Sequence, residues 1–186
     1  MQQAAELAKK AISIDPNFSD SYTILGAIAL ATGDYAGAIK LGRRAVDLSP
    51  NSAEITAALG MIYNFAGRPK DAIKQIGQAM RLSPRHPSWY FYQMGLAHYL
   101  VGDFSRAIDN FEELLKKDPK APASRMLLIA SYVRTNRLEA ARAAARVFRE
   151  RHPSMHPGKA LTLSEPFQDP SIVKGIVENL KAAGLD

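Results

Sequence analysis

Small and apolar residues recur at nearly fixed spacing along this chain, and residues 19–52 show the pattern in full. Spacings of three and four residues place side chains on one face of a helix, so this stretch predicts two helices joined by a turn at Gly33. The marked positions are Tyr22, Leu25, Gly26 and Ala29 in the first helix, Ala38, Gly42 and Ala45 in the second, and Pro50 after it.

The same pattern returns in residues 53–86, 88–121 and 122–155. Gly67 and Gly102 occupy the turn position in two of these copies, and Asn136 occupies it in the last. Asparagine is the residue that best replaces glycine in a left-handed conformation, so its place supports the alignment of the copies. Residues 1–18 match only the second helix of a further copy.

This arrangement resembles the tetratricopeptide repeat, a helix-turn-helix unit of about 34 residues with small and aromatic positions and a closing proline. The resemblance covers residues 1–155 and implies an all-α, right-handed solenoid of antiparallel helix pairs. Gly26, Gly60 and Gly95 lie opposite alanines of the second helices, which agrees with close packing within each pair.

A linker, residues 156–168, and a final helix, residues 169–184, follow the repeats. Ile172, Ile176 and Leu180 form an apolar stripe on this helix, and the end of a solenoid needs a cap. We expect the helix to cover the flank of the fourth repeat around Val147 and Phe148. The alternative is the groove of the solenoid, where the stripe would take the place of a ligand.

Residues on the inward side of the first helices form the candidate binding groove. Its middle is aromatic, and aromatic and arginine side chains are enriched at binding hot spots. For Phe65 and Leu96, packing between helices is an equally good interpretation. The predicted groove residues are Met61, Asn64, Phe65, Trp89, Tyr92, Leu96, Tyr99, Met126 and Arg134.

These features predict a non-catalytic protein-interaction scaffold that binds a peptide or helix in its concave groove. In tetratricopeptide domains that hold the free carboxylate of a peptide tail, lysine, arginine and asparagine recur at inward positions. Only Asn64 and Arg134 are polar here, which argues against a receptor for chaperone tails and favours an apolar strand or an amphipathic helix.

The tail offers a second resemblance. Residues 166–170 and 180–185 are similar to the ends of bacterial class III adenylate and guanylate cyclases that carry tetratricopeptide repeats, although Gln168, Asn179 and Ala182 depart from their pattern. This resemblance implies that the chain is the regulatory C-terminal region of such a cyclase, as the alternative to an independent scaffold.

Charge suggests a second alternative, a nucleic-acid-binding surface on the fourth repeat. The net charge is +6, and residues 120–151 hold eight basic residues against two acidic ones. Basic patches attract nucleic acid. No recognition module accompanies this one, so we interpret the arginines as the solvated outer side of an alanine-rich helix.

Sequence patterns for chemistry are weak, and we predict no catalysis, no cofactor and no metal site. His152 and His156 are four residues apart, but Pro153 and Pro157 disfavour a regular helix there. His98 replaces an aromatic packing residue, which favours a core histidine.

The composition sets further bounds. The chain has 186 residues, no cysteine and no apolar run of the length that spans a membrane, so we expect a cytoplasmic protein. Because it begins with half a repeat, we expect a fragment of a larger protein with Met1 as an engineered start. Leu7, Ala8, Ala11 and Ile12 then lack a partner helix, which predicts self-association through residues 2–15.

Overall fold

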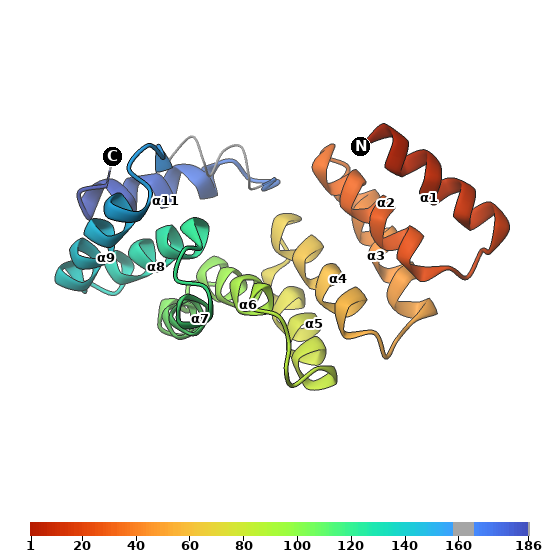
Figure 1. Cartoon of the computed structure of the whole chain (residues 1–186), viewed down its shortest axis with the longest axis horizontal. Helices are drawn as coiled ribbons and strands as arrows, with labels where there is room; N and C mark the ends of the chain where they lie inside the picture. Colours follow the sequence, from red (N-terminus) through yellow and green to blue (C-terminus); the bar gives the residue numbers. More distant parts are fainter. Residues whose placement is uncertain (158–165, 186) are drawn as a thin grey trace. The chain divides into compact units, whose positions relative to one another are not determined.

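A computed structural model describes residues 1–157 and 166–185 of the chain, and the regular elements among them are helices (Figure 1). Five belong to the first part of the chain: α1 (Gln2–Ile14), α2 (Ser19–Ala31), α3 (Tyr35–Leu48), α4 (Ala53–Phe65) and α5 (Pro69–Leu82). The later ones are α6 (Trp89–Leu100), α7 (Phe104–Lys117), α8 (Pro122–Arg134), α9 (Leu138–Arg151) and α11 (Ser171–Ala182). None of the helices in these described ranges is long and apolar enough to cross a membrane.

The turns within the repeats depend on left-handed residues at the predicted places. Gly33, Gly67 and Gly102 have φ of 82°, 68° and 82°, and Asn136 has φ of 59°. Such short turns return the second helix along the first, so α2 packs on α3, α4 on α5, α6 on α7 and α8 on α9. The prediction made from the glycines and from Asn136 is confirmed.

Two compact units divide the chain: unit 1 is Met1–His86 and unit 2 is Pro87–Asp186. In unit 1, α1 packs on α2, and α4 packs on α3 and α2 as well as on α5. Its core includes Ala38, Ala45, Ala72, Ile76 and Ala79, all fully buried.

Close approach of paired helices requires glycine where the sequence placed it. A methyl group at Gly60 would lie 2.5 Å from Ile76 Cγ1, and one at Gly95 would lie 2.8 Å from Phe111 Cε1. Real side chains do not tolerate such distances, so these two helix pairs pack closely only because the residue has no side chain.

Unit 2 holds the last two repeats and α11. As in unit 1, the second helix of one repeat packs on the first helix of the next, α7 on α8. The final helix begins at Ser171, after an Asp169 carboxylate that accepts a hydrogen bond from the Ser171 N–H at 2.8 Å. Most of the predicted linker, residues 158–165, lies outside the described residues.

Candidate functional site

The predicted groove residues of unit 1 lie on α4 and are mostly buried. Asn64 is fully buried, Phe65 is 5% exposed, and Met61 is half-buried. Helix α4 contacts α2, α3 and α5, so most of its circumference faces protein. The expectation that Asn64 is a polar group lining the groove is therefore wrong, and Phe65 packs between helices.

The predicted groove residues of unit 2 divide into three classes of exposure. Leu96, Met126 and Tyr99 are buried, Trp89 and Tyr92 are half-buried, and Arg134 is exposed. The Tyr92 ring centroid lies 6.3 Å from that of Phe111, and Trp89 meets Tyr90 edge to face at 4.4 Å. The rings of Trp89 and Tyr92 are therefore not fully solvated, because each contacts another aromatic ring within unit 2.

Tyr99 is covered by the final helix. The Asn179 side-chain amide on α11 donates a hydrogen bond to the Tyr99 hydroxyl at 3.3 Å, and Tyr99 is only 8% exposed. We expected this ring to face an open groove, and that expectation is wrong because α11 lies on the same side.

Helix α11 packs on α8, the first helix of the fourth repeat (Figure 1). Ile176 and Leu180 are fully buried there. We call the side of α6 and α8 that faces α11 the first-helix face of unit 2. The favoured flank around Val147 and Phe148 is therefore a wrong prediction, and the alternative position, on the first helices, is the observed one.

A physical reason for this position lies in the two surfaces available to α11. The first-helix face offers aromatic and aliphatic side chains, including Tyr99 and Leu100, to an apolar stripe. The α9 side presents exposed Arg142, Arg146 and Arg149, whose charges would lose water under an apolar helix. The last turn of α11 and the residues just after it lie beside α9, where Arg149 donates to the Gly184 carbonyl.

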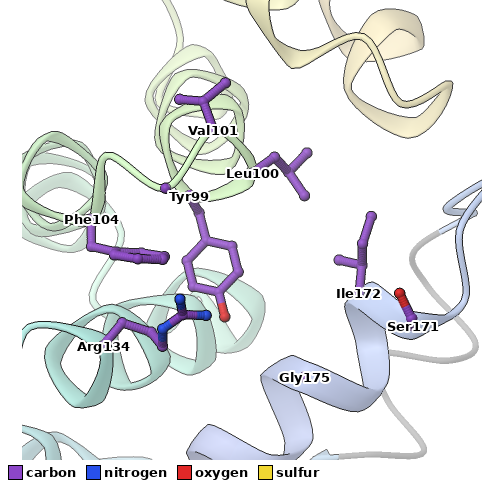
Figure 2. A pocket seen from close by; sticks show the side chains of 9 residues that line it. Tyr99, Leu100, Val101, Phe104, Arg134, Ser171, Ile172 and Gly175 are labelled. Atoms are coloured by element: carbon purple, nitrogen blue, oxygen red, sulfur yellow. The ribbon is translucent and has the colours of Figure 1, made fainter.

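An open cleft of about 400 Å³ remains beside the docked helix. Figure 2 shows Tyr99 of α6, Phe104 of α7 and Arg134 of α8 on one side, and Ile172 and Gly175 of α11 on the other. The rings of Tyr99 and Phe104 meet edge to face at 5.3 Å, and the Arg134 guanidinium lies 4.4 Å from the Phe104 centroid.

The cleft combines apolar side chains with polar groups and one positive charge. Burial raises the pKa of the Tyr99 hydroxyl, while the Asn179 hydrogen bond and the Arg134 charge act in the opposite direction. Tyr99 is therefore a neutral hydroxyl near Arg134 at neutral pH. The lining residues of the cleft include no carboxylate, and within residues 1–157 and 166–185 no ion pair involves Arg134.

The histidines that sequence singled out have structural places. His98 is 8% exposed, and its Nδ1 lies 3.7 Å from Asp103 Oδ2, which confirms the prediction of a core histidine. Burial is the main cause that lowers the His98 pKa. His152 is half-buried, with its ring 5.1 Å from that of Phe148. Across the described parts of the chain, no three potential metal ligands come together.

Comparison with protein families gives the same repeat in three overlapping or adjacent stretches. Models described as tetratricopeptide repeat match residues 7–40, 29–90 and 92–156. A search of curated proteins found no match.

Several solved structures share the fold at low sequence identity. PilW, described as a widely conserved type IV pilus biogenesis factor, is 19% identical with a TM-score of 0.79, over 98% of this chain and 81% of its own. The PilF protein of Pseudomonas aeruginosa is 19% identical with a TM-score of 0.73, over 98% and 79%. YrrB, described as a tetratricopeptide-repeat protein with an unusual peptide-binding site, is 16% identical with a TM-score of 0.68, over 96% and 91%.

At these identities the likeness shows the fold alone. None of the three named structures is a cyclase, so the resemblance of the tail to bacterial cyclases stays a prediction. The family matches and the shared fold agree with the glycine turns and the paired helices described above. The chain therefore carries tetratricopeptide repeats, and its fold is the all-α, right-handed tetratricopeptide-repeat solenoid with a C-terminal capping helix.

Proposed function

We propose that the chain is a non-catalytic protein-interaction scaffold whose first-helix face in unit 2 binds an amphipathic helix of a partner protein. The observation that carries the proposal is α11 itself. Tetratricopeptide repeats support a scaffold in general, and this helix supplies a specific example of what the face accepts.

The contact of α11 follows the pattern of helix-in-groove recognition, in which apolar anchors recur every three or four residues. Ile176 and Leu180 are four residues apart and fully buried. Lys174, which precedes them, and Glu178, which lies between them, are exposed. Burying a side chain of this size contributes about 1.5–3 kcal/mol. A partner helix would reproduce these two anchors with apolar side chains four residues apart.

A partner helix must compete with α11 for this face. Because α11 is tethered to the repeats, its effective concentration exceeds that of a free partner at ordinary cellular amounts. Only chains with α11 released can bind the partner. The apparent dissociation constant is therefore the intrinsic one divided by the fraction of released chains. We propose that the full chain binds its partner weakly and that release of α11 increases the affinity.

The test supplies α11 as a separate peptide. In the full chain, Ile176→Asp and Leu180→Asp together place two charges against the face and should release α11. A fluorescent peptide of residues 169–185 should then bind this variant and give a rise in anisotropy, and it should bind the unmodified chain much more weakly. Lys174→Asp is the matched control, because it changes charge on the exposed side of the same helix and should leave α11 docked.

A second change locates the bound peptide. Adding Met126→Asp on α8 to the released variant should remove peptide binding, because Met126 is 1% exposed on the helix that α11 covers. Circular dichroism checks that the repeats stay folded in each variant. If the folded, released variant does not bind the peptide, the first-helix face has no general affinity for such helices and the proposal is wrong.

A further inference from the structure

We propose that the cleft between α6 and α11 binds a carboxylate that lies next to an apolar side chain in a segment of a partner protein (Figure 2). This inference goes beyond the helix-binding function, because it uses docked α11 as one wall of a second site. The ligand class follows from the walls, the charge and the free donors of the cleft.

The walls combine apolar side chains with polar groups, and the cleft is large enough for a side chain. Tyr99 and Phe104 form an aromatic corner, with centroids 5.3 Å apart; Leu100 lines the cleft from the same helix as Tyr99, and Ile172 lines it from α11. The volume of about 400 Å³ lies within the range of ligand sites, roughly 300–1,000 Å³. A phenyl or branched aliphatic group would contact the aromatic rings on one side and would leave the polar part of the lining, which includes Ser171 and Arg134, to a polar group of the ligand.

The charge is a single guanidinium held in place by an aromatic ring. Arg134 lies over Phe104 at 4.4 Å, and stacking occupies a face of the planar group while its N–H bonds point outward in the plane. The described residues provide it with no carboxylate partner. Such an edge pairs with a carboxylate through two parallel hydrogen bonds.

A second donor lies close to this edge. A tyrosine hydroxyl accepts and donates, and Tyr99 already accepts from Asn179 at 3.3 Å. Its own hydrogen stays available for donation to a ligand, and the Arg134 guanidinium lies near the same ring in Figure 2. Together these groups present positive charge and hydrogen-bond donors, which select an anion.

One cation beside aromatic and aliphatic side chains favours a carboxylate over a nucleic acid. A nucleic-acid strand is held by several cations along its phosphates, whereas the residues that line this cleft include a single one. An aspartate or glutamate beside a phenylalanine, leucine or isoleucine matches both parts of the cleft. We therefore assign the ligand to an acidic-apolar pair of residues in a partner protein.

Gly175 allows the cleft to be closed without damage to the helix. No atom lies within 4 Å of a methyl group added there, so Gly175→Ala should be tolerated, and Gly175→Leu should extend into the cleft that Gly175 lines. Alanine and leucine are both better helix formers than glycine, so neither change should weaken α11.

The experiment titrates small peptides into the full, ¹⁵N-labelled chain and follows the amide signals of Gly102 and Gly175. The probe is N-acetyl-Asp-Phe-amide. N-acetyl-Asn-Phe-amide lacks only the charge, and N-acetyl-Asp-Ala-amide lacks only the ring. We expect the probe to bind about tenfold more tightly than either, since a charge-assisted pair and a buried ring each exceed 1.4 kcal/mol.

Variants of the chain complete the test. Arg134→Gln should weaken the probe about tenfold, because it removes the charge-assisted pair, and Gly175→Leu should remove binding. Two controls should have little effect on binding: Gly175→Ala and Arg146→Gln. Arg146 is an exposed residue of α9 that does not line the cleft. Equal binding of the Asp and Asn peptides, or full binding to Gly175→Leu, would overturn the proposal.

One further ligand distinguishes a protein segment from a free acid. 3-Phenylpropanoate carries the ring and the carboxylate without a peptide, so tighter binding of this acid than of the probe would overturn the assignment to a partner protein. The outcome is independent of the helix-binding test. The released variant with Ile176→Asp and Leu180→Asp should lose the cleft even if the first-helix face binds no peptide.

Discussion

Leu180→Ala gives the most direct measure of how firmly α11 is held on α8. The side chain is fully buried, and its truncation removes three carbon atoms from that contact. At about 0.8 kcal/mol for each carbon, with a cavity contribution in addition, the loss is about 3 kcal/mol. Because 1.4 kcal/mol is a factor of ten, the docked state should become about a hundredfold less favoured relative to the released one.

Hydrogen exchange followed by mass spectrometry measures this change locally. Backbone amides in residues 171–182 should exchange about a hundredfold faster in the variant if they exchange through release of α11. Amides in α2–α5 belong to unit 1 and should keep their rates. Val177→Ala is the matched control, since Val177 is only half-buried and should accelerate exchange about fivefold, for a loss of about 1 kcal/mol.

Two results would refute this reasoning. Unchanged exchange in residues 171–182 would mean that Leu180 contributes little to docking despite its burial. Equal acceleration in α6, α7, α8 and α9 would mean that α11 cannot leave without unfolding unit 2. In that case α11 is an integral part of the unit, and no partner helix could replace it in a folded chain.

The remaining predictions concern packing, pH and helix α1. Gly60→Ala should lower the free energy of unfolding of unit 1 in urea by about 1–3 kcal/mol, because the new methyl group would lie 2.5 Å from Ile76. Gly33→Ala should lower it by about 1–2 kcal/mol through the φ of 82° alone. Burial lowers the His98 pKa, although the Asp103 charge opposes the shift. The unfolded chain therefore binds a proton at His98 more readily than the folded chain does. The stability of unit 2 should decrease as the pH falls below about 6.5. His98→Gln should flatten that dependence in thermal unfolding between pH 7 and pH 5, and an unchanged slope would assign it to other groups. Leu7 and Ile14 are 61% and 77% exposed, so we predict self-association through residues 2–15, which Leu7→Glu should reduce in sedimentation velocity at high concentration.

The repeats could be predicted from the sequence because each depends on local signals. A left-handed turn residue such as Asn136, with φ of 59°, and a glycine such as Gly95, too close to Phe111 for any side chain, are requirements that few residue types satisfy. Such requirements recur in every copy, and recurrence makes the pattern visible in one sequence. The caps of individual helices do not recur in this way: Ser52 accepts a hydrogen bond from the Ile55 N–H at the start of α4, whereas α5 begins at Pro69 without a side-chain cap.

The candidate site could not be predicted in the same way, because it depends on where a non-repeated helix packs. The apolar stripe of α11 was visible, but an apolar stripe does not specify its partner. The choice between α8 and the α9 flank depends on the desolvation of arginines and on one hydrogen bond, from Asn179 to Tyr99. Phe104 and Gly175 were missed for the same reason, since neither belongs to the inward positions of a first helix.

The two proposed sites are linked by thermodynamics, because one needs α11 docked and the other needs it released. A ligand in the cleft binds only the docked state and therefore favours it, while a partner helix on the first-helix face binds only the released state. Each ligand must lower the apparent affinity for the other by the same factor. The size of this factor is limited by the docking equilibrium of α11, so destabilising the helix at Leu180 weakens the cleft ligand and strengthens the partner helix together. The final helix then acts as more than a cover for the last repeat, since its position decides which of two partner chemistries unit 2 can accept.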